Sequence, residues 1–170
     1  MGQSGMTFFQ GSEEYVLDNK GRVTIPPYMR RALSPEARET FTITRGVRKC
    51  IIAYPIDQWE KIQHKLMELN PFNPENDKII TFLTMFCKEV TLDAQNRILI
   101  PKDLLTYAKI DTKALIVGKI DHIEIWNPEE FARIYSFDEE EYAQIFEKVL
   151  GTNHYNNQES KYEANEPKQV

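Results

Sequence analysis

Short apolar stretches separated by turn-forming residues make up most of the chain, and stretches with helical periodicity interrupt them. From Ile56 to Leu69, apolar residues recur at steps of three and four, which predicts a helix with one face toward a core. Other helices are expected at about residues 28–33, 75–86, 102–107, 128–135 and 138–149. Stretches rich in Ile, Val, Thr and Phe predict strands at about residues 7–17, 23–25, 40–45, 50–54, 87–92, 97–100, 113–118 and 122–126. This mixture predicts an α+β protein.

One stretch occurs twice, at an offset of 75 positions from Asp18 to Asp93. Residues 15–27 read Tyr-Val-Leu-Asp-Asn-Lys-Gly-Arg-Val-Thr-Ile-Pro-Pro, and residues 90–102 read Val-Thr-Leu-Asp-Ala-Gln-Asn-Arg-Ile-Leu-Ile-Pro-Lys. Each copy is an apolar strand, an Asp-x-x-x-Arg turn and a second strand that ends at Pro, which cannot extend a ladder. Further along the chain the repetition continues at an offset of 72. Each copy is too small to bury a sufficient core alone, so we expect the two halves to intertwine.

Five segments are expected along the chain. The first five residues, Met-Gly-Gln-Ser-Gly, are interpreted as an expression-tag remnant. Residues 6–70 and 87–150 are expected to form the two halves, with residues 71–86 as a connecting helical segment. Residues 151–170 are polar and low in apolar residues, which is typical of a disordered tail.

The residue types give little support for catalysis or for a bound cofactor. Cys50 and Cys87 stand far apart with no Cys-x-x-Cys spacing, which favours isolated thiols in a reducing cytoplasm over a disulfide or a metal site. The three His are scattered, and no Gly-x-Ser-x-Gly, His-Glu-x-x-His or Gly-rich phosphate loop occurs. No apolar run approaches the ~20 residues of a membrane span. We therefore expect no enzyme, no metal, no cofactor, no small-molecule substrate and no membrane partner.

The charge is unevenly distributed. The net charge of −5 argues at first against nucleic acid. From Asp18 to Lys49, however, the chain contains eight basic and three acidic residues, whereas residues 128–150 contain seven acidic and two basic ones. Such asymmetry permits one face to attract phosphate. A solvated charged surface explains the same runs, so charge alone leaves both interpretations open.

The Asp-x-x-x-Arg turn admits two interpretations. In the first, Asp18 accepts backbone N–H bonds within its own turn, and Arg22 pairs with a neighbouring carboxylate to hold the hairpin. In the second, Asp18 still shapes the turn while Lys20 and Arg22 point outward to an anion. Two-stranded ribbons fit the DNA major groove, where Arg bonds guanine bidentately. The recurrence of the same Arg in both halves favours the second interpretation, because a doubled site fits a doubled target.

The paired hairpins, each followed by apolar-Ile-Pro, resemble the MraZ family of bacterial transcriptional regulators. Thr44-Arg45-Gly46, Tyr54-Pro55-x-x-x-Trp59 and Ile123-Glu124-Ile125-Trp126 carry the same resemblance, which covers about residues 6–150. It implies a swapped-hairpin, AbrB-like β-barrel of two tandem pseudo-repeats with flanking helices, related to the AbrB and MazE domains. It also implies a closed homo-oligomeric ring that binds double-stranded DNA at short direct repeats in the promoter of the division and cell-wall gene cluster. The expected location is cytoplasmic and nucleoid-associated.

The resemblance assigns DNA contacts first to the motif arginines, Arg22 and Arg97, and then to Lys20. Asp18 and Asp93 are assigned to turn shaping, because a carboxylate that faces phosphate is repelled. Gly21 and Asn96 are assigned to the same role, because both residue types adopt the left-handed conformation. The second turn lacks Lys, so the first hairpin is expected to be the stronger anchor. Gln95 at the second tip is a further candidate DNA contact.

Two other functions stay open. A non-enzymatic ring-forming subunit, whose hairpins meet protein, would select no DNA sequence. An antitoxin-like DNA-binding protein would need a segment that neutralises a toxin. Residues 152–170 are the only candidate for that segment, and they lack the apolar anchors that such segments use.

Overall fold

The computed structural model describes residues 8–151. Their contacts divide the chain into two compact units, with the boundary between Arg133 and Ile134, and each unit is described by itself. Residues 1–5, and the expected tail beyond Gly151, lie outside the described residues.

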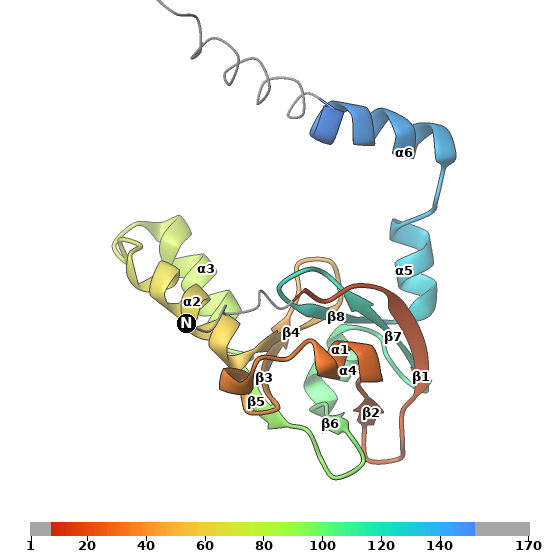
Figure 1. Cartoon of the computed structure of the whole chain (residues 1–170). Helices are drawn as coiled ribbons and strands as arrows, with labels where there is room; N and C mark the ends of the chain where they lie inside the picture. Colours follow the sequence, from red (N-terminus) through yellow and green to blue (C-terminus); the bar gives the residue numbers. More distant parts are fainter. Residues whose placement is uncertain (1–7, 152–170) are drawn as a thin grey trace, which may run out of the picture. The chain divides into compact units, whose positions relative to one another are not determined.

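The first unit shows the predicted repeat in its order of elements (Figure 1). The first half reads strand, strand, helix, strand, strand, helix: β1 (Ser12–Val16), β2 (Arg22–Thr24), α1 (Pro27–Arg31), β3 (Thr40–Arg45), β4 (Ile51–Pro55) and α2 (Ile56–Met67). The second half repeats that order: β5 (Lys88–Thr91), β6 (Arg97–Leu99), α4 (Lys102–Tyr107), β7 (Lys113–Gly118), β8 (Ile123–Trp126) and α5 (Pro128–Ile134). Two further elements stand outside the repeat, a 3₁₀ turn η1 (Pro35–Ala37) and α3 (Pro74–Thr84). The turn η1 lies in the loop where the offset between the copies falls from 75 to 73, because the strand pairings make Thr40 of β3 equivalent to Lys113 of β7. The offset of 72 is reached after the next turn, where Ile51 is equivalent to Ile123.

Strand pairing joins the two halves. One sheet has the order β1-β7-β8-β4-β3-β5, a second consists of β2 and β6, and every pairing is antiparallel. Four of the pairings cross between the halves, namely β1 with β7, β2 with β6, β3 with β5 and β4 with β8. Each half therefore supplies strands to the other, as the small size of each repeat predicts.

The expected closed barrel is not found among the described residues. The strands β1 and β5 form the two edges of the larger sheet, and β2 and β6 form a separate ladder. Each strand of that ladder is three residues long. Pro26 and Pro101 follow closely, and because proline has no backbone N–H, neither strand can be extended to bridge the larger sheet. The observed fold is α+β with an open antiparallel sheet.

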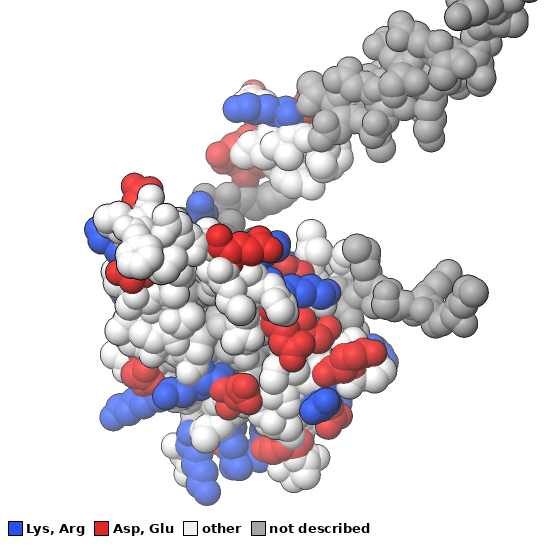
Figure 2. Space-filling model, turned by 90° about the vertical axis from the view of Figure 1, so that its left-hand side faces the viewer, with Lys and Arg blue, Asp and Glu red and all other residues white. Residues whose placement is uncertain are grey.

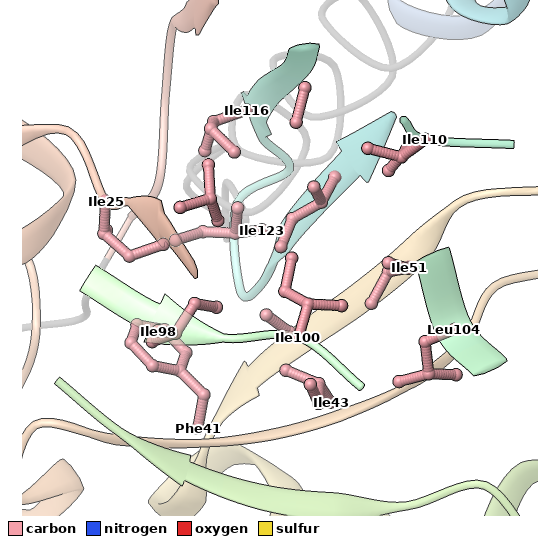
Figure 3. Packing of buried hydrophobic residues seen from close by; sticks show 14 of the residues in the cluster. Ile25, Phe41, Ile43, Ile51, Ile98, Ile100, Leu104, Ile110, Ile116 and Ile123 are labelled. Atoms are coloured by element: carbon pink, nitrogen blue, oxygen red, sulfur yellow. The ribbon is translucent and has the colours of Figure 1, made fainter. Parts of the chain in front are cut away.

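The core draws isoleucines and other apolar side chains from both halves (Figure 3). Residues two positions apart point to the same side of a strand, and one such apolar pair is buried in the region of every strand except the edge strands β1 and β5. These pairs are Val23 and Ile25, Phe41 and Ile43, Ile51 and Ala53, Ile98 and Ile100, Ala114 and Ile116, and Ile123 and Ile125. Leu104 of α4 and Met29 of α1 close the same cluster. The packing that stabilises the first unit is thus shared between the repeats.

The helix α2 at the end of the first half and the helix α3, which lies in the predicted connecting segment of residues 71–86, carry exposed apolar side chains. The helix α2 buries Trp59, whereas α3 buries none of its residues. At the start of α3, the Asn73 side chain accepts hydrogen bonds from the N–H groups of Glu75 and Asn76, which caps the helix. Exposed apolar side chains gather along this α2–α3 hairpin at Met67, Phe72, Ile79, Phe82 and Met85. Exposed apolar patches commonly mark interaction surfaces.

The second unit consists of α6 (Glu139–Phe146) and a π-helical turn, η2 (Glu147–Gly151), where the sequence predicts one continuous helix. The Asp138 carboxylate accepts the N–H of Glu141 and caps the start of α6. Three glutamates occupy its first turn, where the helix dipole favours negative charge. Its apolar side chains are exposed at Tyr142, Ile145, Phe146, Val149 and Leu150. No helix within residues 8–151 has the length and apolar character that crossing a bilayer requires.

Both cysteines are free thiols, as predicted. Burial raises the pKa of the Cys50 thiol to about 12 and also raises the pKa of Cys87. Within the described part of the chain, no group of three His, Cys, Asp or Glu side chains is placed to hold a metal ion.

Candidate nucleic-acid interface

The first turn is organised by one carboxylate. Oδ1 of Asp18 accepts the backbone N–H groups of Lys20 and Arg22, each at 2.9 Å. The backbone closes the turn, because Gly21 N donates to Asp18 O and Asp18 N donates to Arg22 O, both at 3.0 Å. Gly21 has φ +82°, a left-handed conformation that glycine adopts without strain. Local hydrogen bonding by the aspartate therefore forms this turn.

The second turn repeats this arrangement bond for bond. Oδ1 of Asp93 accepts the N–H groups of Gln95 and Arg97 at 2.9 Å. Asn96 N donates to Asp93 O at 2.8 Å, and Asn96 takes the left-handed conformation at φ +62°. Asparagine is one of the few residues that adopt this conformation at low cost. The replacement of Gly by Asn therefore leaves the geometry of the turn intact.

Substitution of Gly21 tests this assignment. A Cβ at Gly21 would lie 3.1 Å from Ile100 O and 3.2 Å from Leu105 Cδ1, in a backbone conformation that L residues avoid. We expect Gly21→Ala to lower the free energy of unfolding by about 1–3 kcal/mol, measured by urea denaturation. The matched variant Asn96→Gly places the unstrained residue at the equivalent position and should change it by less than about 0.5 kcal/mol. Equal losses in both variants would contradict this account.

Four charged side chains from the two turns form one cluster, the Asp–Arg cluster. Within each turn the Arg pairs with its own Asp, at 2.6 Å for Arg22 Nε to Asp18 Oδ2 and 2.8 Å for Arg97 Nη2 to Asp93 Oδ2. Across the turns, Arg97 Nη1 lies 3.5 Å from Asp18 Oδ2, and Arg22 Nη1 lies 4.0 Å from Asp93 Oδ2. The pairing of β2 with β6 places Arg22 opposite Leu99 and Thr24 opposite Arg97, which brings the turns together. The carboxylate pairing of the first interpretation is therefore present.

The arginines remain accessible despite these contacts. Between 22% and 32% of each of the four side chains in the cluster is exposed. A guanidinium has five N–H donors, and the bonds to the aspartates use only part of that set. The Asp–Arg cluster thus orients two arginines and leaves part of each available at the surface.

Both aspartates are ionised over the physiological pH range. Backbone hydrogen bonds from Arg22, with its side chain and Lys20 adding to them, outweigh desolvation and lower the pKa of Asp18 to about 2. The Arg97 side chain, followed by its N–H and that of Gln95, lowers the pKa of Asp93. Because these values are depressed, the stabilisation is complete above the ordinary pKa of 3.8 and is lost as pH falls through about 2 for Asp18. At neutral pH the cluster therefore has no net charge.

The two turn tips differ. Lys20 is exposed, and no carboxylate among residues 8–151 forms an ion pair with it. The Gln95 amide oxygen instead accepts a bond from Arg97 Nη2 at 3.0 Å. Both turns lie at the lower edge of the first unit in Figure 1, and Lys and Arg side chains project from that lower edge in Figure 2. Because the Asp–Arg cluster is neutral, the excess positive charge at the two turns comes from Lys20 at the first tip.

Comparison with known proteins identifies the family. The model of the family described as “MraZ protein, putative antitoxin-like” matches this chain twice, over residues 8–81 and 84–153. The chain belongs to the MraZ family. The transcriptional regulator MraZ of Syntrophobacter fumaroxidans is 33% identical over 148 residues, which is 87% of this chain and 98% of that protein. The transcriptional regulator MraZ of Christiangramia forsetii is 30% identical over 146 residues, 85% of this chain and 94% of that protein.

Each of the two matches to the MraZ family contains one Asp-x-x-x-Arg hairpin. The two hairpins belong to separate family matches, and the structure brings them together, because Arg22 and Arg97 lie in one cluster with both aspartates. Two arginines near the second turn, Arg30 and Arg38, received no role from the sequence beyond their count in the basic run. A comparison of the two repeats could have singled them out, because Arg30 is equivalent to Leu105 at an offset of 75 and Arg38 is equivalent to Asp111 at an offset of 73.

Proposed function

We propose that this protein is a sequence-specific DNA-binding transcriptional regulator that reads short direct repeats through its two Asp-x-x-x-Arg hairpins. The observation that carries the proposal is the joining of both hairpin turns, each with a partly exposed arginine, at one edge of the molecule. Two-stranded ribbons fit the major groove, and arginine is the residue that most often contacts guanine there. The naming of two relatives as transcriptional regulators supports it. The proposed target is the promoter of the division and cell-wall gene cluster, on the nucleoid.

In the proposed mechanism the aspartates hold the arginines in position for DNA. Asp18 and Asp93 bond the Nε side of each guanidinium, so the remaining donors are oriented before DNA arrives. Such preorganisation reduces the entropy lost on binding. Because the cluster is neutral, it contributes hydrogen-bond donors for discrimination between bases rather than general attraction. Lys20 supplies the attraction to phosphate at the first tip, and Gln95 offers its amide beside Arg97 at the second.

We further propose that the protein acts as a homo-oligomeric ring. The net charge of −5 and the small number of exposed cations at the hairpins mean that several subunits must engage repeated sites together to give strong binding. The apolar side of the α2–α3 hairpin is the proposed subunit contact. It includes a groove of about 530 Å³ lined by Leu66, Met67, Leu69, Pro71 and Ile80, among others. The crossed strand pairings support a swapped-hairpin arrangement of the AbrB kind as the subunit fold.

A charge placed on the α2–α3 hairpin should reduce the size of the assembly. Phe82 is 62% exposed on α3, so Phe82→Glu should not disturb the fold of the chain but would bury a charge in a subunit contact. We expect native mass spectrometry to show smaller species for this variant. Val47 is 94% exposed on the turn between β3 and β4, and Val47→Glu is the matched control that should keep the wild-type mass. An unchanged mass for Phe82→Glu would exclude this face from the contact.

Selection of DNA from a random pool tests the function itself. Duplexes recovered with the wild-type protein should be enriched in one short sequence repeated in the same orientation at a regular spacing. Recovered DNA no richer than the input in any sequence would instead favour a ring-forming subunit whose hairpins contact protein.

A further inference from the structure

A cleft lies beside the second hairpin and is lined by two arginines. Its volume is about 260 Å³, and Arg30 and Arg38 line it together with Leu33, Ser34, Pro35, Glu39 and Leu92. Leu92 immediately precedes Asp93, the residue that organises the second turn. The cleft therefore belongs to the surroundings of that turn, although both arginines come from the first half of the chain.

Local structure positions the Arg30 side chain and the Arg38 backbone. Arg30 lies in the last turn of α1, and its Nε donates to the carbonyl oxygen of Ile25 at 3.1 Å. Arg38 follows η1 in the left-handed conformation, with φ +49°, and its N–H donates to Pro35 O at 3.2 Å. The next carbonyl along, that of Glu39, accepts the N–H of Leu92 at 2.9 Å. The loop that carries Arg38 is thus hydrogen-bonded to the strand that enters the second turn.

The equivalent place beside the first hairpin has the opposite character. There Leu17 N donates to Thr112 O at 2.8 Å, which is the counterpart of the bond from Leu92 to Glu39. The residue before Thr112 is Asp111, in the place of Arg38. Leu105, whose side chain lies beside Gly21, occupies the position that corresponds to Arg30. The first hairpin therefore has Lys20 at its tip and no cation at the two positions equivalent to Arg30 and Arg38, whereas the second has Gln95 at its tip and these two arginines at its flank.

We infer that the cleft between Arg30 and Arg38 binds a backbone phosphate of DNA and supplies to the second hairpin the positive charge that Lys20 supplies to the first. This inference rests on the proposed function, since the phosphate belongs to the same DNA. Phosphate contacts fix the register of a protein on the duplex while base contacts provide the sequence preference. The Glu39 carboxylate also lines the cleft, so the two arginines leave it with a net positive charge of one. Within residues 8–151 neither arginine forms an ion pair with a carboxylate.

The salt dependence of DNA binding tests this inference. Each lost phosphate contact reduces the slope of log affinity against log salt concentration by about 0.9. We expect Arg38→Asn to reduce that slope by this amount for each subunit bound and to weaken binding severalfold at low salt. The probe is a mixed-sequence duplex several helical turns long, followed by fluorescence anisotropy across a series of NaCl concentrations. Asparagine tolerates the left-handed backbone at this position, so the variant keeps the loop intact. Glu39→Asn removes the opposing charge and should strengthen binding.

Lys49→Asn is the matched control. Lys49 is an exposed basic residue with φ +58°, and it lies beyond the opposite end of β3 from Arg38. Its replacement removes the same charge from the same kind of backbone position and should leave slope and affinity unchanged. A slope unaltered in Arg38→Asn, or reduced equally in Lys49→Asn, overturns the inference while the wild-type protein still binds. A wild-type protein that binds no duplex at any salt concentration overturns the proposed function as well.

Discussion

Replacement of Arg22 by Ala is expected to abolish measurable binding to repeated DNA sites while the mass of the assembly stays unchanged. A bidentate contact from arginine to guanine is worth about 1–3 kcal/mol, which corresponds to about 5-fold to 150-fold in affinity. In an oligomer every subunit has the change, so the losses combine through multivalent binding. Fluorescence anisotropy with DNA selected by the wild-type protein measures the affinity, and native mass spectrometry measures the assembly.

A companion variant separates DNA contact from hairpin support, because Arg22 pairs with Asp18 at 2.6 Å. In Asp18→Asn the amide oxygen can still accept the turn N–H groups, but the ion pair is gone. If Arg22 contacts DNA, Asp18→Asn weakens binding less than Arg22→Ala does, because the guanidinium is still present and has lost only its orientation by Asp18. If Arg22 serves only to hold the hairpin, both variants lose binding alike, and the first interpretation of the motif holds.

Arg133 provides the control for removal of a positive charge. It lies on α5, 69% of its side chain is exposed, and it pairs with Glu130. Surface ion pairs of this kind contribute little to stability, so Arg133→Ala should leave both the fold and the DNA affinity near the wild-type values.

Replacement of Ile98 by Ala is expected to lower the free energy of unfolding by about 2–5 kcal/mol. Ile98 is fully buried, pairs with Val23 across the β2–β6 ladder and packs in the core shared by both halves. The neighbouring Leu99 on the same strand is 52% exposed, and Leu99→Ala should cost less than about 0.5 kcal/mol. Urea denaturation compares the two.

The two tryptophans show whether the halves lose structure together. Trp59 lies in the first half and Trp126 in the second, and both are buried. Fluorescence of Ile98→Ala in Trp59→Phe and Trp126→Phe backgrounds therefore reports each half separately. Because strands of one half pair with strands of the other, both probes should shift to the same lower midpoint. A shift confined to the Trp126 probe would contradict a shared core.

The sequence predicts those parts of the fold that depend on local signals. The order of strands and helices in both repeats follows from apolar spacing. The small size of each repeat predicts that strands of one half pair with strands of the other, although it does not say which strands. The open sheet does not follow, because closure depends on which edge strands meet across long stretches of chain. The break between α6 and η2 at Glu147 also has no counterpart in the apolar pattern, which is continuous there.

In the candidate site, too, the features that depend on local signals were predictable and those that depend on distant parts of the chain were not. Asp18 and Asp93 shape turns through bonds within four residues, so spacing and residue type are sufficient to predict them. The approach of Arg97 to Asp18 depends on the register of β2 against β6, which no local pattern specifies. The cleft at Arg38 likewise depends on the bond from Leu92 to Glu39.

The Asp–Arg cluster has a consequence for how the duplicated halves change over time. Each aspartate lies near the arginine of its own copy and that of the other. Loss of one aspartate therefore leaves two guanidinium groups, one from each copy, with a single carboxylate to offset their mutual repulsion. Substitutions in contact through such a network are not additive. The two copies are therefore constrained to diverge together, and a chain that kept one hairpin and lost the other would also lose the contacts between the two turns.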